Sequence, residues 1–85
     1  MATVEIYTQA WCPYCARAKD LLDAKGTAYR EIDAPYGSPE RAEAIERSNG
    51  RTSVPQIFID GLHIGGSDDL GAFERSGELD RLLAA

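Results

Sequence analysis

The sequence predicts a single α/β domain in which one mixed sheet is covered by helices, in the order β-α-β-α-β-β-α. Three observations lead to this fold class. The chain opens with a strand pattern, a helix pattern and a second strand pattern; Asp60-Gly61 separates two further strand patterns; and 85 residues suit one hydrophobic core. We therefore treat residues 1–85 as one domain.

The opening β-α-β unit follows from hydrophobic periodicity. Residues Thr3–Thr8 alternate polar and apolar side chains and are rich in strand formers, which predicts a strand. Gly26 is placed to end the helix that follows, and Tyr29–Ile32 predicts a second strand that runs parallel to the first. One face of that helix carries the apolar residues Ala18, Leu21 and Leu22.

The second half of the chain is marked by capping and turn residues. Ser38-Pro39 is a favourable start for a second helix, which we expect to run to about Asn49. Gln56–Ile59 and Leu62–Ile64 flank Asp60-Gly61, a strong signal for a two-residue hairpin.

A third helix is expected after the hairpin. Ser67 or Asp68 is predicted to cap it, the helix should run through Phe73, and Gly77 should end it. The last leucines predict one more short helical turn: Leu79, Leu82 and Leu83.

Charge and composition exclude several function classes. Nine basic residues against fourteen acidic ones give a formal charge of −5, and the basic residues are scattered. Nucleic acids and anionic membrane surfaces are therefore poor partners, whereas a small anionic ligand needs only one local positive site. No apolar run approaches the roughly 18 residues that a spanning helix needs. Met1–Glu5 shows no secretory signal, so we expect a cytoplasmic protein.

Cys12-Pro13-Tyr14-Cys15 lies where the first strand ends and the first helix begins. Unpaired N–H groups and the dipole at a helix N-terminus stabilise a thiolate, the form that attacks disulfides. Cys12 is nearer the exposed tip and is the predicted nucleophile. Cys15, one turn further along, is placed to attack a mixed disulfide formed at Cys12. Proline at the first helical position costs nothing.

Half of a zinc site is the alternative for these cysteines. A structural zinc site takes four ligands, and this chain offers two cysteines and His63. We interpret His63 as an ordinary strand residue with an exposed ring. Cys-x-x-Cys beside a β-α-β unit instead indicates redox chemistry, and we expect no metal.

The segment Tyr7–Cys15, read as Tyr-Thr-Gln-Ala-Trp-Cys-Pro-Tyr-Cys, resembles the active site of the dithiol glutaredoxins. Arg51–Pro55, Gln56–Asp60 and His63–Leu70 agree with the same family, so the resemblance covers nearly the whole chain, at the length of its small bacterial members. It implies a thioredoxin fold with a four-stranded mixed sheet. It also implies glutathione-dependent reduction of protein disulfides and protein–glutathione mixed disulfides.

The resemblance further implies where glutathione binds. The family's segment matching Ser53-Val54-Pro55 hydrogen-bonds glutathione through the main chain of Val54 and has a cis proline. The residues alone would favour a trans proline at an edge strand. Gly66, Ser67 and Asp68 match the site of the γ-glutamyl end, where helix N–H groups hold a carboxylate. Capping is the alternative role for Ser67 and Asp68, and we assign Asp69 mainly to it.

Gln9, Arg41 and Tyr14 match family positions, whereas Trp11 is less usual beside the cysteine. Gln9 stands where the family often has the lysine that binds the glycyl carboxylate. Arg41 matches the family's second contact at that end, or else lies on a solvated helix face. Tyr14 packs beside bound glutathione in the family, or covers the disulfide. Trp11 contacts protein substrates, or packs partly against the loop.

Two other functions compete with the reductase. One is a carrier that bridges a 2Fe–2S cluster between two subunits, using the active cysteine and glutathione; Pro13 disfavours it because such members usually lack that proline. The other is a redoxin reduced directly by thioredoxin reductase, which Gly65–Asp68 disfavours. The substrates that the resemblance implies are glutathionylated or disulfide-bonded proteins, ribonucleotide reductase among them. We expect a monomer, and the sequence leaves the one-thiol and two-thiol routes open.

Overall fold

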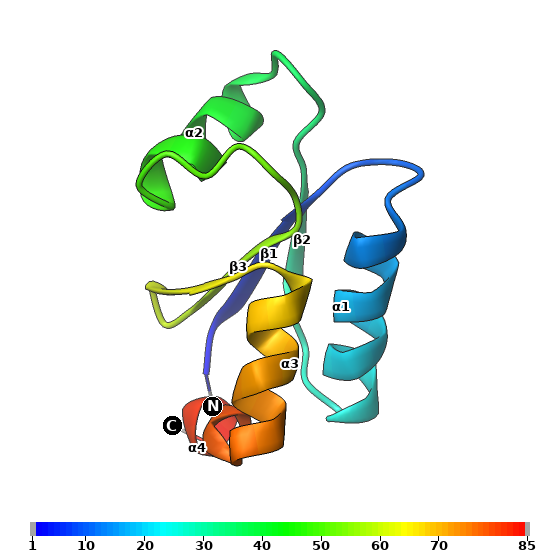
Figure 1. The fold of residues 1–85 in the computed structure, drawn as a ribbon, viewed down its shortest axis with the longest axis vertical. Coiled ribbons are helices and arrows are strands. Elements are labelled where there is room, and N and C mark those ends of the chain that lie inside the picture. The colour runs from blue at the N-terminus through cyan, green and yellow to red at the C-terminus, as the bar shows by residue number, and fades with distance from the viewer. Residues whose placement is uncertain (1, 85) are drawn as a thin grey trace.

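The sheet has four strands in the order β2-β1-β3-β4 (Figure 1). The computed structural model describes residues 2–84, and Met1 and Ala85 of the predicted domain lie outside the described residues. The strands are β1 (Val4–Thr8), β2 (Arg30–Asp33), β3 (Gln56–Ile59) and β4 (Leu62–Gly65). β1 is parallel to β2 and antiparallel to β3, and β3 is antiparallel to β4. The predicted mixed sheet is therefore confirmed.

The helices cover both faces of this sheet. They are α1 (Pro13–Ala24), α2 (Pro39–Arg47), α3 (Ser67–Ser76) and α4 (Glu78–Ala84). Figure 1 shows α1 and α3 side by side, with α2 set apart from them. The final helical turn that was predicted forms α4.

Strand alternation divides the core between the two faces, because successive side chains of a strand point to opposite sides. Ile6, Ile57 and Ile59 pack with residues of α1, α3 and α4. Tyr7 follows Ile6 and Phe58 follows Ile57, so their side chains lie on the opposite face of the sheet, where they pack with Ala44 of α2. Both faces of β1 and β3 are thus covered by core residues.

Most predicted boundaries hold to within two residues. Ser38 caps α2 by accepting a hydrogen bond from the Arg41 N–H, and Pro39 is its first residue, as expected. The hairpin turn has positive φ at both Asp60 (50°) and Gly61 (81°), the conformation that its residue types favour.

The predicted cap of α3 is wrong. Gly66, rather than Ser67 or Asp68, is the N-cap residue. The carboxylate of Asp69 reaches back and accepts a hydrogen bond from the Gly66 N–H at 2.9 Å, which confirms the capping role assigned to Asp69. Gly65 must lack a side chain here, because its φ is +116° and a Cβ would overlap the Asp69 carboxylate.

Candidate active site

The two cysteines lie at the junction of β1 and α1, where the chain turns from the sheet into the helix. Cys12 is the N-cap of α1, Pro13 follows at the first helical position, and both thiols are free. The Cys15 N–H donates to the Cys12 sulfur at 3.1 Å. A helix-end N–H therefore points at Cys12 Sγ, the arrangement that favours a thiolate.

The two thiols differ sharply in their surroundings. Cys12 is partly exposed, whereas Cys15 is 2% exposed beneath it. Burial, followed by the interaction with the Cys12 side chain, raises the pKa of Cys15 to about 12. Cys15 is therefore a protonated thiol at neutral pH, and the Cys12 sulfur is the one that a substrate can reach.

A loop preceding β3 lies against the cysteine pair. The Val54–Pro55 peptide bond is cis, as the family resemblance implied. The Cys12 thiol donates to the Val54 carbonyl across 3.9 Å, so the loop borders the sulfur directly. In residues 2–84 no hydrogen bond engages the Val54 N–H, which leaves it open to a ligand.

A hollow of about 210 Å³ runs from this loop to the start of α3. It brings together most of the residues predicted to bind glutathione: Tyr14, Ser53, Val54, Pro55, Gly66, Ser67 and Asp68. Gln9 and Arg41 do not line it. Arg51 and Asp69 do, joined by an ion pair of 3.0 Å.

The ion pair between Arg51 and Asp69 was missed by sequence reasoning, because no local pattern links a loop arginine to a helix start. The Gly66 N–H, and then Arg51, lower the pKa of Asp69. The pairing neutralises both charges, so the carboxylate of Asp68, which has no ion-pair partner in residues 2–84, is the remaining charge of the hollow.

Arg41 is buried, so its interpretation as a solvated helix residue is wrong. Its side chain is 3% exposed and donates to the carbonyls of Ala34 and Thr52 and to the Gln9 side chain. The Tyr36 ring covers the guanidinium at 4.2 Å. Every partner in residues 2–84 is a neutral oxygen, so the positive charge of Arg41 is retained beneath the site.

A second hollow, of about 750 Å³, opens on the α1–β2 side of Cys12. It is bordered by the loop that carries Gln9 and Trp11 and by the side chains of Lys19, Glu31 and Asp33. Lys19 and Thr8 both hold the Glu31 carboxylate, and these two contacts lower its pKa. Trp11 is 98% exposed, so it does not pack against the loop.

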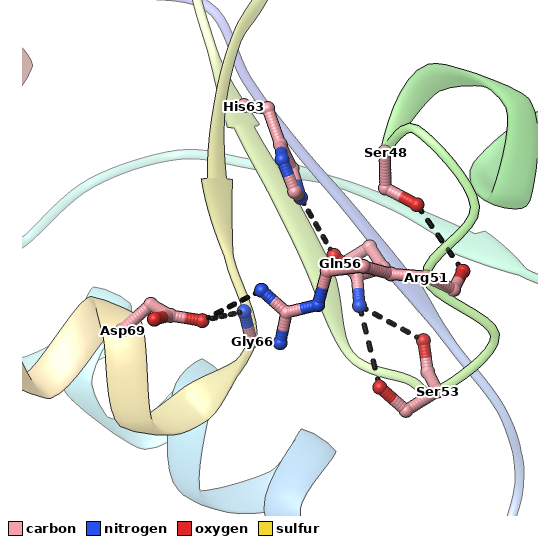
Figure 2. A network of polar contacts seen from close by, with 7 residues as sticks. All are labelled: Ser48, Arg51, Ser53, Gln56, His63, Gly66 and Asp69. Carbon is pink, nitrogen blue, oxygen red and sulfur yellow. Dashed lines mark hydrogen bonds and ion pairs between the residues drawn. The ribbon is translucent and has the colours of Figure 1, made fainter.

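His63 does not have the exposed ring that the sequence suggested. It is half-buried, its ring lies 5.1 Å from the Phe58 ring, and Nε2 is 2.7 Å from the Gln56 side-chain oxygen. Figure 2 shows Gln56 between His63 and Ser53. Gln56 was not predicted as a site residue, since a strand position before three apolar residues suggests only packing.

Residues 2–84 contain neither a cluster of metal-binding side chains nor a helix suited to span a membrane. Nowhere do three or more histidine, cysteine, aspartate or glutamate side chains gather as a metal site would require. No helix among these residues is both long enough and apolar enough to span a bilayer.

Comparison with known proteins gives a consistent result. The family model described as Glutaredoxin matches residues 4–64. The chain is 57% identical to Glutaredoxin 3 of Escherichia coli over 83 residues, which are 98% of this chain and 99% of the relative. It is 55% identical to a Glutaredoxin of Pseudomonas aeruginosa over the full length of both. The crystal structure of a buckwheat glutaredoxin–glutathione complex superposes with a TM-score of 0.87 at 31% identity, covering 98% of this chain and 77% of that one.

Proposed function

We propose that glutathione is the reductant of this chain, which belongs to the glutaredoxin family. The chain has the thioredoxin fold of that family and is a thiol–disulfide oxidoreductase. One observation carries the proposal. Of the two cysteine sulfurs, that of Cys12 is within reach of solvent, and it borders the Val54 carbonyl. The hollow beside it is lined by backbone groups and charged side chains that suit a peptide with two carboxylates and one ammonium group.

The cysteinyl and γ-glutamyl parts of glutathione are assigned to groups that line this hollow. The extended backbone of Val54 offers its open N–H and its carbonyl to the cysteinyl part. The first N–H groups of α3, at Ser67 and Asp68, have no intrahelical partner and suit the γ-glutamyl carboxylate. The Asp68 carboxylate suits the ammonium group. Tyr14, half-exposed at the rim, packs beside the peptide.

The glycyl carboxylate is assigned to Gln9, with Arg41 behind it. Because the Gln9 side-chain oxygen accepts from Arg41 at 2.8 Å, its NH₂ group is left to donate outward. The retained charge of Arg41 adds a positive potential at this point. This pair thus takes the place of the lysine that the family often has.

The reaction consists of two thiol–disulfide exchanges. The Cys12 thiolate attacks the glutathionyl sulfur of a protein–glutathione disulfide; the S–S bond breaks and the protein sulfur leaves as a thiolate, which takes up a proton. The thiolate of a second glutathione then attacks the glutathionyl sulfur held on Cys12. Glutathione disulfide leaves, and the Cys12 thiolate is restored.

Cys15 supports a slower, alternative resolution. To attack the Cys12 sulfur it must first lose a proton, and the burial of Cys15 disfavours its thiolate. We therefore propose that the one-thiol route dominates for glutathionylated substrates. The two-thiol route serves protein disulfides, in which the mixed disulfide at Cys12 contains no glutathione.

Protein substrates are assigned to the side of Cys12 that carries Trp11 and the larger hollow. An exposed indole beside a nucleophilic sulfur offers apolar contact area to a polypeptide. Glutathionylated proteins and ribonucleotide reductase are the substrates that the family suggests. A monomer in a reducing cytoplasm, where glutathione is abundant, is part of the same proposal.

A coupled assay tests this function. The wild type, Cys12→Ser and Cys15→Ser are compared in the reduction of a glutathionylated peptide with glutathione, glutathione reductase and NADPH. We expect Cys12→Ser to be inactive and Cys15→Ser to keep most of the wild-type rate. A wild type that is inactive here but is reduced by thioredoxin reductase would contradict glutathione dependence. Visible absorption and iron in the purified protein would instead support the cluster carrier.

A further inference from the structure

The loop that leads into Pro55 is held by side chains rather than by strand pairing. Residues 51–55 belong to no helix or strand, yet three successive carbonyls in this loop each accept a side-chain hydrogen bond. The Ser48 hydroxyl shares its one hydrogen between the carbonyl of Arg51 at 3.1 Å and that of Ile45 at 3.2 Å. Arg41 donates to the carbonyl of Thr52 through both Nε (3.2 Å) and Nη2 (2.9 Å).

Gln56 holds the third carbonyl. Its Nε2 donates to the Ser53 carbonyl at 3.0 Å, immediately before Val54 (Figure 2). Ser48, Arg41 and Gln56 are all buried, and with Thr8 they make up the buried polar side chains of residues 2–84. We call Ser48, Arg41 and Gln56 the carbonyl clamp.

The burial of the Gln56 side chain is unfavourable unless its amide makes specific hydrogen bonds. It begins the interior strand β3, is 0% exposed, and precedes three buried apolar residues, Ile57–Ile59. Burying an amide there is unfavourable unless both of its ends are hydrogen-bonded, whereas another apolar side chain would need no partners. Both ends are in fact used, since the oxygen faces His63 and the nitrogen faces Ser53.

The Ser53 carbonyl fixes the direction of this amide, and the amide in turn fixes the tautomer of His63. The Ser53 carbonyl can only accept, so the Gln56 atom beside it is the NH₂ group and the oxygen must face His63 Nε2 at 2.7 Å. His63 therefore carries a hydrogen on Nε2. Burial, and then Arg51, lower the pKa of His63, so at neutral pH the ring is the uncharged Nε2–H tautomer.

We propose that the carbonyl clamp positions the Val54 backbone for glutathione before the ligand arrives, with Gln56 as its last and closest member. This inference rests on the proposed function. A loop already held in its binding geometry loses less conformational freedom on binding, so preorganisation appears as affinity. The clamp residues act through Ser53 and its neighbours; they are positioning residues.

The test combines affinity with loop rigidity. Gln56→Glu keeps the volume and the acceptor for His63 but turns a carboxylate oxygen toward the Ser53 carbonyl. Ser48→Ala removes one donor and puts folding at little risk. Binding of S-methylglutathione, which has no free thiol, is measured by NMR titration, and the order parameter of the Val54 N–H by ¹⁵N relaxation.

We expect the dissociation constant to rise about tenfold in Gln56→Glu and about threefold in Ser48→Ala, the range that one lost hydrogen bond produces. The Val54 order parameter should fall in both. Tyr7→Phe is the matched control: it removes a buried hydroxyl whose hydrogen-bond partners are Glu43 and Arg47 and not a carbonyl of the loop, and it should lower stability without changing either readout.

The outcomes separate this inference from the proposed function. Wild-type affinity and a rigid Val54 in folded Gln56→Glu and Ser48→Ala would overturn the clamp while glutathione binding stands. Weaker binding with an unchanged Val54 order parameter would also overturn it, because it would indicate direct contact with the ligand. If Gln56→Glu does not fold, Ser48→Ala decides. A wild type that binds no S-methylglutathione would contradict the proposed function itself.

Discussion

The Arg41 guanidinium donates from Nη1 to the Gln9 side-chain oxygen at 2.8 Å, which joins the middle of the chain to the loop before the cysteines. In the proposed function, this contact lets a glutamine serve where the family often has a lysine. The positive charge is then that of the buried Arg41, and the Gln9 amide is the group that donates to the ligand. A neutral donor backed by a buried charge loses less to solvent screening than an exposed ammonium does.

Arg41→Met should impair both stability and glutathione use. The change leaves the buried carbonyls of Ala34 and Thr52 without their donor, which we expect to lower the free energy of unfolding in urea by about 2 kcal/mol. It also frees Gln9, so the KM for glutathione should rise severalfold. Arg75→Met, at an exposed position of α3, is the control and should change the free energy of unfolding by less than about 0.5 kcal/mol. Equal effects in the two variants would contradict the role given to Arg41.

The buried thiol of Cys15 should make the reduced protein sensitive to alkali. Its pKa is about 12 in the folded chain against a reference value of 9.0, so the folded state holds its proton when the unfolded state has lost it. The stability that this gives is complete below pH 9 and is lost as the pH rises from 9 toward 12, by at most about 1.4 kcal/mol per pH unit.

Urea unfolding of the reduced wild type and of Cys15→Ser measures this effect. Tyrosine and lysine side chains also titrate in the same window, but they do so in both proteins. The difference between the two curves therefore isolates Cys15. We expect the wild type to lose stability faster than Cys15→Ser above pH 9; parallel curves would mean that Cys15 is not buried in solution.

Local signals in the sequence predicted the framework well. The helix start at Ser38-Pro39, the turn at Asp60-Gly61 and the cysteines at a strand-to-helix junction each depend on residues that are neighbours in the chain. The cis bond at Pro55 is different, because the residues alone favour trans and only the family resemblance indicated it.

The errors at Arg41 and His63 share one physical cause, which is hydrogen bonding to residues that lie outside their own helix or strand. Arg41 looks like a solvated helix residue because its acceptors are mainly backbone carbonyls, which carry no sequence signal. His63 is drawn inward by Gln56 across the hairpin, where the strand register shifts. The cap of α3 had a readable signal, since an acid three residues after Gly66 is half of a capping box, but Ser67 and Asp68 were the more familiar capping types.

Asp69→Asn should loosen the start of α3. The carboxylate accepts from the Gly66 N–H and pairs with Arg51; asparagine keeps an acceptor for the N–H but loses the charge, which we expect to cost about 0.5 kcal/mol at pH 7. Both contacts lower the pKa of Asp69 in the folded chain. Their contribution to the free energy of unfolding is therefore present above the carboxyl's ordinary pKa of 3.8, and it is lost as the pH falls through the lower pKa of the folded state. Thermal unfolding should therefore separate the wild type from Asp69→Asn at pH 7 and bring them together in strong acid. A constant difference at every pH would contradict the ionic part of the interaction.

Trp11 should matter for protein substrates and not for folding. The side chain is 98% exposed, and its backbone has a φ of 61°, a conformation that costs non-glycine residues about 1 kcal/mol. Trp11→Gly should therefore raise the free energy of unfolding by up to about 1 kcal/mol, whereas Trp11→Ala should leave it nearly unchanged. Both variants should reduce kcat/KM severalfold for a folded glutathionylated protein and leave it unchanged for a glutathionylated tripeptide, because only the larger substrate extends over the indole. If the two substrates lose activity equally, Trp11 acts on the thiolate or the glutathione groove instead, and the docking role assigned to this side of Cys12 is wrong.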